Sequence, residues 1–427
     1  MRKSVLLALT VACAAHIPAQ TARDGRVALS LADAVDMALE RNVTIARNTI
    51  SLGANERAKS HAWNSISPSA SVSGGLSVPD GIGDSGSPSD YTAELSGAIS
   101  LSFSPNLFTS IKSARISYEQ GVVSYEQACR TVELNVREAF YGLLYEKENI
   151  TLQERNLQTA KDQYEQNLAK YNQGRMSELD VLSAEVRYKS LQPTVENAHI
   201  TFLNDLEAFA QLIGMDGTPQ IDLQGSLDDV QVSGRVTLDG VEINAPAVVS
   251  LQKQLEKAQN DLLAARFSAY APSITASWSH GLSSGKEKNS GSFSLRANIP
   301  LDGVLPWSKG ADGIASAQDT IADLELQLAD AQRSLAVSTQ SSLRKISQSQ
   351  SSLTARRANV ELAQRTYDMT LQAYNRGTKD LLSLQNASDD LLSAQVSLMS
   401  EQRALISAVL ALEHTIGVPF GTLSDKK

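Results

Sequence analysis

Two short clusters of polar side chains are the strongest candidates for a functional site in this chain of 427 residues. Each has the pattern Tyr-Asn-x-Gly with a basic side chain just after the glycine, and the patterns begin at Tyr171 and Tyr374. Glycine tolerates the positive φ of a tight turn between antiparallel helices, so Gly174 and Gly377 predict two such turns. The hydroxyl, amide and basic groups that flank them suit hydrogen bonds and ion pairs to a neighbouring helix.

Catalysis and nucleic-acid binding have little support in the sequence. The chain has five histidines, and none stands at the spacing of a metal-binding pair. It contains no GxSxG, HExxH or phosphate-loop motif. We therefore expect no enzyme activity and no metal or other cofactor. The formal net charge is −9 and no basic patch stands out, so nucleic acid is not an expected partner.

The N-terminus has the pattern of a secretion signal over residues 1–19. A positively charged start precedes an apolar stretch over Ser4–Ala12, and small residues follow it. Ordinary cleavage is expected near Ala15 or Ala19. No other stretch approaches 18 uninterrupted apolar residues, so we expect no transmembrane helix.

The two cysteines suggest an alternative fate for the signal. Leu9-Thr-Val-Ala stands directly before Cys13 and resembles a lipoprotein cleavage box, in which Cys13 becomes lipidated. Thr10 departs from that box, where an aliphatic residue is usual. Cys129 is the other cysteine, so an exported chain has no internal disulfide.

The two polar clusters belong to a long internal repeat. Tyr171 and Tyr374 are 203 positions apart, and the same offset relates Ile213-Gly214 to Ile416-Gly417. This period is too long for a solenoid and indicates a duplicated half-molecule. The expected organisation is a first repeat at residues 20–215, a linker at 216–245, a second repeat at 246–418 and a C-terminal tail at 419–427.

Each repeat is expected to contain a helix, a β-hairpin and a long helical hairpin, in that order. In the first repeat a helix starts after the capping residue Ser30 and runs to about Trp63. The apolar period then changes to that of a strand, and it changes back after Pro105. The expected bounds in the first repeat are strands at about 66–78 and 91–104 and a helical hairpin at about 106–213. Those in the second repeat are a helix at about 246–269, strands at about 273–280 and 292–300, and a helical hairpin at about 308–415.

The four expected strands alternate apolar residues with serine and carry almost no charge in their middles. Their length matches the ~9–11 residues that a tilted strand needs to cross a bilayer. Four strands cannot close a barrel, and an open edge in lipid leaves backbone groups unpaired. Two copies of the chain give eight strands and three give twelve. The fold class is therefore mainly α with a membrane β-barrel contribution from several copies.

The long helices also require neighbours. The helix that leads to Tyr171 spans about 66 residues, or roughly 100 Å at 1.5 Å per residue. Its apolar residues follow a seam close to heptad spacing, which is typical of a coiled coil. Antiparallel pairs from each repeat and each copy are expected to assemble side by side into a hollow cylinder that continues the barrel.

The chain resembles the TolC-type outer-membrane efflux proteins from Leu29 to Pro419. The resemblance rests on the opening segment from Leu29 to Leu39, on the two β-hairpins, and on the doubled Tyr-Asn-x-Gly before a return helix. It implies a homotrimer with a 12-stranded barrel in outer-membrane lipid and an α-barrel in the periplasm.

The resemblance also implies a function and partners. The protein would be the passive exit duct of a tripartite efflux pump or a type I secretion system, for small molecules or polypeptides. An inner-membrane transporter would deliver them, linked through a periplasmic adaptor. A periplasmic coiled-coil adaptor or scaffold is the alternative, although it has no need for four strands of membrane length.

By the same resemblance, the two helical turns are the periplasmic tip, which would gate the duct and dock the adaptor. Polar contacts from Tyr374, Arg376 and Lys379 to a neighbouring helix would hold this gate closed. Ser383 and Asn386 stand where several family members have acidic side chains, while the first repeat keeps Asp180, so the second repeat departs from the acidic ring of those members. The candidate residues are Tyr171, Asn172, Gly174, Arg175, Asp180, Tyr374, Asn375, Arg376, Gly377, Lys379, Ser383 and Asn386.

Overall fold

The computed structural model of the chain describes residues 27–77, 92–215, 221–229, 236, 238, 243–284 and 290–423. The expected signal, the lipidation site Cys13 and the loop between the first two strands lie outside these residues. The described residues form two compact units. The helical unit consists of the described residues up to Ala46, of Gln127–Ala245 and of those from Leu335 onward. The strand unit consists of Arg47–Glu126 and Pro246–Ser334.

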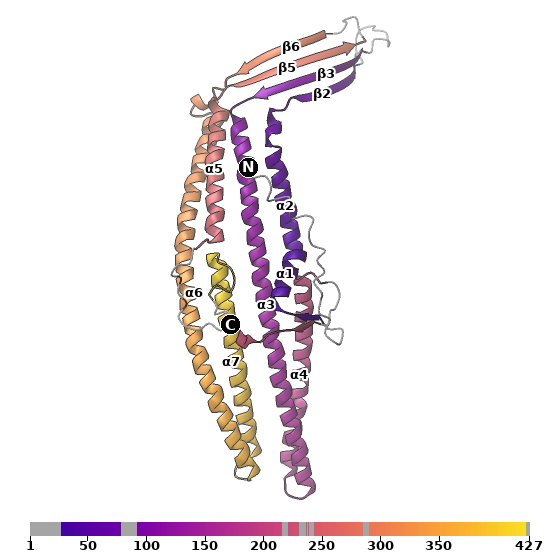
Figure 1. Cartoon of the computed structure of the whole chain (residues 1–427), viewed down its shortest axis with the longest axis vertical. Coiled ribbons are helices and arrows are strands. Elements are labelled where there is room, and N and C mark those ends of the chain that lie inside the picture. The colour runs from indigo at the N-terminus through magenta and orange to yellow at the C-terminus, as the bar shows by residue number, and fades with distance from the viewer. Residues whose placement is uncertain are drawn as a thin grey trace, which may run out of the picture. The chain divides into compact units, whose positions relative to one another are not determined.

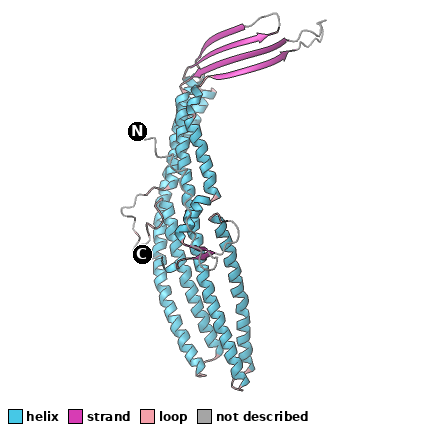
Figure 2. Cartoon of the chain, turned by 45° about the vertical axis from the view of Figure 1, so that its right-hand side comes forward, coloured by secondary structure: helices cyan, strands magenta, loops and turns pink. Residues whose placement is uncertain are grey.

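The strand unit contains an antiparallel sheet with the strand order β2-β3-β5-β6 (Figures 1 and 2). The strands are β2 (Ser69–Ser77), β3 (Thr92–Phe103), β5 (Ser273–Ser283) and β6 (Ser290–Asn298). Each repeat contributes one hairpin, and the hairpins join through the pairing of β3 with β5. Strands β2 and β6 are left as the two edges, each with one unpaired row of backbone groups.

The register of this sheet separates apolar from polar side chains. Ile99 pairs with Ala70 and with Trp278, and Trp278 pairs with Phe293, so one apolar face runs across all four strands. On the other face, serine hydroxyls bond across neighbouring strands. These pairs are Ser69–Ser100, Ser73–Ser96, Ser277–Ser294 and Ser279–Ser292, with oxygen–oxygen distances of 2.7, 2.8, 2.7 and 3.0 Å. The alternation predicted from the sequence is therefore confirmed.

The first helix is shorter than predicted. The helix expected to run to Trp63 is broken at Asn42, which separates α1 (Leu31–Arg41) from α2 (Val43–Ser60). The Asn42 side chain donates to the carbonyl of Leu212 at 2.9 Å and accepts from the N–H of Thr44 at 2.8 Å, so its amide competes with the helical hydrogen bonds. The prediction of Ser30 as N-cap is correct, because its hydroxyl accepts the N–H of Asp33.

The start of the first strand also differs from the prediction. Residues Ala62–Ile66 form the short 3₁₀ helix η1, so β2 begins at Ser69 and not at Ile66. Because η1 follows α2 almost directly, residues that were expected to begin the strand adopt 3₁₀ geometry instead. The apolar Ile66 fits the period of the strand by coincidence.

The remaining helices form two long hairpins, each preceded by its β-hairpin (Figure 1). Helices α3 and α6 have 67 residues each, as the coiled-coil pattern led us to expect. The bounds are α3 (Asn106–Asn172), α4 (Glu178–Leu212), α5 (Pro246–Tyr270), α6 (Lys309–Asn375) and α7 (Leu381–Ile416). Among the described residues, no helix is both long enough and apolar enough to cross a lipid bilayer. In both repeats a helix, a β-hairpin and a long helical hairpin follow one another in this order.

The segment expected to be a plain linker contributes to the helical unit. Its β4 (Ile221–Leu223) pairs in parallel with β1 (Val27–Leu29), and the 3₁₀ turn η2 (Leu227–Asp229) follows. Lys147 on α3 bonds to Asp222 at 3.0 Å. Three-residue strands are too short for a pattern of alternation to predict them.

A pair of carboxyl groups lies between α3 and α4 in the helical unit. Burial, together with the neighbouring carboxyl of Asp205, raises the pKa of Glu146 to about 7 against the opposing charge of Arg403. One buried oxygen of Glu146 has no hydrogen-bond partner among the described residues. Two carboxylates cannot donate to each other, so a proton on one of them supplies the missing bond.

Candidate functional site

The predicted turns after Tyr171 and Tyr374 close the two long hairpins, at the ends of the helical unit's helices (Figure 1). Gly174 has a φ of 68° and Gly377 a φ of 73°. Behind each glycine, the next residue returns a hydrogen bond to the helix: Arg175 N–H to the Lys170 carbonyl at 2.9 Å, and Thr378 N–H to the Ala373 carbonyl at 3.0 Å. This pattern matches the Schellman arrangement at a helix C-terminus.

Polar caps start the return helices. The Ser177 hydroxyl accepts the N–H of Asp180 and donates to its carboxylate at 2.6 Å, so Asp180 orients the hydroxyl that caps α4. Asp380 caps α7 by accepting the Ser383 N–H at 3.1 Å. Hydrogen bonds from Ser383 hold the pKa of Asp380 below its ordinary value. Two of the candidate residues, Asp180 and Ser383, thus serve the ends of their own helices.

One hydrogen bond joins the two hairpins close to the turns. The hydroxyl of Tyr374 donates to the side-chain oxygen of Asn167 on α3 at 2.9 Å. Asn167 is 1% exposed, and its side-chain nitrogen has no partner among the described residues. The ammonium of Lys170 lies 5.5 Å from the centre of the Tyr374 ring. Tyr374 is therefore held by one neutral and one cationic group of the first repeat.

The same tyrosine has a perturbed acidity. Burial raises the pKa of Tyr374, and the negative charge of Asp180 raises it further, while the bond to Asn167 acts in the opposite direction. The hydroxyl therefore stays protonated and remains a donor at any physiological pH. The predicted residues Asp180 and Tyr374, one from each repeat, thus lie close enough to interact electrostatically.

A second link lies further along the return helices. The guanidinium of Arg187 on α4 forms two bonds to the carboxylate of Asp389 on α7, at 2.7 and 2.9 Å. The Arg187 side chain is only 16% exposed. A bidentate pair of this geometry fixes both distance and orientation, so it holds the return helices of the two repeats together.

A weaker contact joins α7 to α3. The Ser388 hydroxyl donates to the side-chain oxygen of Asn156 at 3.3 Å. Within the first hairpin, Tyr164 stacks on Tyr188 with ring centres 6.2 Å apart. The links between repeats therefore continue for several turns behind the tip.

The other predicted residues form an exposed rim around the two turns. Arg376 and Lys379 make no ion pair among the described residues, so the expected closing contact within one chain is made by Tyr374 alone. The exposed candidates are Tyr171, Asn172, Gly174, Arg175, Asn375, Arg376, Gly377, Lys379 and Asn386. These polar groups are available to a second chain.

Sequence reasoning missed Asn167 and Arg187. The seam predicted for α3 contained apolar residues, whereas at this level of the helix the buried residue is the amide Asn167. An amide at a coiled-coil seam position is a known device for fixing register and could have signalled the contact. Arg187 and Asp389 lie on different repeats, and nothing in a single sequence pairs them. No cluster of side chains that could hold a metal ion occurs in the described part of the chain.

Both repeats match a known protein family, and the sequence has a characterised relative. The model of a family described as "Outer membrane efflux protein" matches residues 28–215 and 238–418, which are the two repeats. The chain is 23% identical to the outer membrane protein TolC of Salmonella enteritidis over 321 residues. That match covers 69% of this chain and 62% of the relative's length.

Solved structures share the fold at low sequence identity. The Campylobacter jejuni CmeC outer membrane channel is 16% identical, with a TM-score of 0.73 over 91% of this chain and 85% of the other. The open state of the Neisseria gonorrhoeae MtrE outer membrane channel is 17% identical, with a TM-score of 0.74 over 91% of this chain and 89% of the other. The family match extends over both repeats, and the fold agrees with it: the chain belongs to the outer membrane efflux protein family.

Proposed function

We propose that the protein is a passive exit duct in the outer membrane, with a large periplasmic portion. The four-stranded sheet is the observation that carries this proposal. Its apolar face is left open, with Val72 80% and Phe293 71% exposed, and its other face is lined with paired serines. An apolar face suits lipid and a hydroxyl face suits a water-filled lumen.

The open edges of the sheet support a homotrimer. Strands β2 and β6 each need a partner, because unpaired backbone groups cost several kcal/mol each in lipid. Pairing β2 of one copy with β6 of the next satisfies both edges, and three copies supply the twelve strands that the family resemblance implies. The long hairpins of three copies then form the periplasmic α-barrel.

The duct would act with two partners. A periplasmic adaptor would dock on the exposed polar rim of the tips, and an inner-membrane transporter would supply the cargo and the energy. Efflux of small molecules and type I secretion of polypeptides both fit a duct lined by small polar side chains. The cargo would be selected by the transporter, because serines and amides along a lumen offer no specific pocket.

The tip would be the gate. In this proposal the Tyr374–Asn167 bond and the Arg187–Asp389 pair hold the second hairpin against the first, and opening breaks them. Both links use groups that can find water when released, so each opposes opening by only a modest amount. A closed state held by such links suits a passage that another protein must open.

Recording in planar bilayers tests the channel. The purified protein is expected to form long-lived conducting pores, and membrane fractions should release it only with detergent. Release by a carbonate wash, together with absence of conductance, would instead favour a periplasmic adaptor or scaffold. Trimer closure is tested separately with cysteines on the two edge strands, such as Ser71→Cys and Ser294→Cys in a Cys129→Ser background. Oxidation should link copies up to a trimer, and each single-cysteine variant serves as the control.

A further inference from the structure

The connection between sheet and helix differs between the two repeats. In the first repeat, β3 ends at Phe103 and α3 begins at Asn106, whereas in the second β6 ends at Asn298 and α6 begins only at Lys309. The junction segment is defined here as residues 299–307 of this longer connection. Its exposed apolar side chains are Ile299, Leu301, Val304, Leu305 and Trp307. Trp307 is 82% exposed, the largest value among the described large apolar residues.

The junction segment is held in place although its side chains are uncovered. The Tyr270 hydroxyl at the end of α5 donates to the Gly303 carbonyl at 2.7 Å. The Tyr270 ring lies so close to Gly303 that a Cβ at this position would come within 2.3 Å of it. Turn hydrogen bonds from Val304 to Leu301 and from Ser308 to Leu305, at 3.0 and 2.9 Å, complete the restraint. A restrained segment that presents apolar side chains outward indicates a partner surface.

Exposed aromatic residues also lie where the sheet meets the helices of the first repeat. Phe103 lies on the apolar face of the sheet, opposite Ile274. Its ring meets the ring of Phe108, in the first turn of α3, edge to face at 6.5 Å. Phe108 is itself exposed, and Trp63 is exposed on η1, which contacts β3. Aromatic residues are typical of the edge of the membrane-spanning band in outer-membrane barrels.

Unpaired positive charge lies on the helices that leave the sheet. Lys112 is in the second turn of α3, Arg266 is four residues before the end of α5, and Lys309 is the first residue of α6. All three are exposed, and none takes part in an ion pair among the described residues. The nearby acidic residues are Asp302 in the junction segment and Asp312 in the first turn of α6, so three positive charges are accompanied by two negative ones there.

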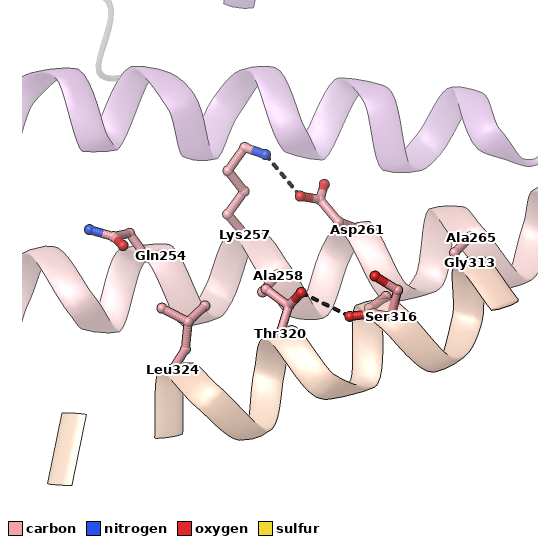
Figure 3. A pocket seen from close by; sticks show the side chains of 10 residues that line it. Gln254, Lys257, Ala258, Asp261, Ala265, Gly313, Ser316, Thr320 and Leu324 are labelled. Atoms are coloured by element: carbon pink, nitrogen blue, oxygen red, sulfur yellow. Dashed lines mark hydrogen bonds and ion pairs between the residues drawn. The ribbon is translucent and has the colours of Figure 1, made fainter. Parts of the chain in front are cut away.

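The charges of α5 further from the sheet are already satisfied. Figure 3 shows the open groove between α5 and α6, lined by small residues such as Ala258 and Gly313. There Lys257 pairs with Asp261 on its own helix at 2.8 Å (Figure 3). The cations of α5 away from the sheet are thus held by carboxylates, whereas Arg266, near the end of α5 that precedes β5, makes no ion pair among the described residues.

We infer that the junction segment and these three cations form an anchor for anionic phospholipid at the lipid–water boundary. This inference rests on the proposed outer-membrane location. Leu301, Val304 and Trp307 enter the outer part of the acyl layer, and Lys112, Arg266 and Lys309 contact the headgroup phosphates. Cations near a membrane surface attract anionic lipid, and long basic side chains reach the headgroups from adjoining helices. The longer connection in the second repeat supplies the apolar part of the anchor.

Lipid quenching of a single tryptophan tests the apolar part. The full chain with Trp63→Phe and Trp278→Phe retains only Trp307 and is reconstituted in vesicles of phosphatidylcholine and phosphatidylglycerol. Bromine near the headgroup end of the acyl chains should quench Trp307 fluorescence about twofold or more, and bromine near the bilayer centre much less. Absence of quenching by either lipid, in vesicles that conduct, would overturn the anchor and favour a protein partner on this surface.

Lipid selectivity tests the charged part. Spin-labelled phosphatidylglycerol should associate with the protein about two- to threefold more than labelled phosphatidylcholine, and Lys112→Gln, Arg266→Gln and Lys309→Gln together should abolish the difference. The matched control changes three exposed cations of α6, Arg344, Lys345 and Arg356, to glutamine. Equal loss in both triple variants would refute a local lipid site. Tryptophan quenching and lipid selectivity in a protein that does not conduct would support the anchor and refute the duct. Conductance without quenching or lipid selectivity would support the duct and refute the anchor.

Discussion

Replacing Tyr374 by phenylalanine removes one hydrogen bond and little else from the tip. The ring stays in place against α3, and so does its contact with Lys170. The buried oxygen of Asn167 loses its donor, and the nitrogen of that amide already has no partner among the described residues. The variant therefore leaves a nearly fully buried amide unsatisfied in the closed state.

The magnitude follows from the cost of that unsatisfied group. Leaving a buried acceptor without its donor costs about 1–3 kcal/mol, and the lower part of that range applies because Tyr374 itself is partly exposed. A loss of about 1–2 kcal/mol corresponds to roughly a 5- to 30-fold change in an equilibrium. If the contact closes the duct, the ratio of open to closed time should rise by this factor.

The assay is single-channel recording, and the repeat provides a matched control. Tyr171 occupies the equivalent place in the first repeat, is 40% exposed and donates no hydrogen bond among the described residues. Tyr171→Phe should change the open-to-closed ratio less than twofold. Asn167→Ala should act like Tyr374→Phe, and the double variant should add little to either.

Two results would refute this reasoning. An unchanged dwell-time ratio for Tyr374→Phe, in trimers with normal helix content, would show that the bond does not oppose opening. Equal effects of Tyr374→Phe and Tyr171→Phe would show that the response is a general effect of removing a hydroxyl at the tip.

Three further substitutions test other parts of the helical unit. Asp389→Asn should loosen the return helices by about 1 kcal/mol, seen as faster hydrogen exchange around Arg187, and the loss should shrink at high salt; salt-independent exchange would contradict an ion-pair role. The raised pKa of Glu146 means that the folded protein favours its protonated form, so the native protein should lose stability as pH rises from about 4.5 towards 7. Glu146→Gln cannot ionise at this position and should not show that loss. Solvent screening limits this term to roughly 1–2 kcal/mol, measured as the denaturant midpoint at pH 5 and pH 8, and equal pH slopes in both proteins would contradict it. Gly377→Ala should lower the free energy of unfolding by about 1 kcal/mol. The cause is the positive φ alone, since a Cβ at this position meets no atom within 4 Å. An unchanged melting temperature would contradict backbone strain at this turn.

Patterns that repeat over many residues were readable from the sequence. The strand alternation, the long helical seams and the glycine turns each depend on local chemistry that the sequence states directly. The sheet register follows from them, because a slip by one residue would mix the serine and apolar faces. The capping residue Ser30 was readable for the same reason, since its hydroxyl serves a backbone group three residues away.

The features that the sequence did not predict all depend on contacts between distant segments of the chain. Asn42 breaks the first helix with the help of the Leu212 carbonyl, 170 positions away. β4 exists because β1 is there to pair with it. The Arg187–Asp389 pair and the burial of Asn167 also depend on tertiary placement. Local propensity has no information on such partners, so a single sequence predicts the helices and strands better than the bonds between the two hairpins.

The inequality of the two tips has a consequence for the assembled duct. The repeats give each chain two hairpins with equivalent turns, yet only Tyr374 is bonded to the other hairpin of its own chain, while Tyr171 remains exposed. In the proposed ring of three chains, six helical hairpins stand side by side and form six junctions between neighbours. One junction lies within each chain, so the contacts described above account for three of the six. The other three lie between chains, where the exposed Tyr171, Arg376 and Lys379 are the groups left to form them. We therefore expect Arg376→Gln with Lys379→Gln to weaken closure only in the trimer, through junctions that Tyr374→Phe leaves untouched. The effects of the paired change and of Tyr374→Phe on the dwell-time ratio should then add, and a strongly non-additive result would place all three residues in one junction.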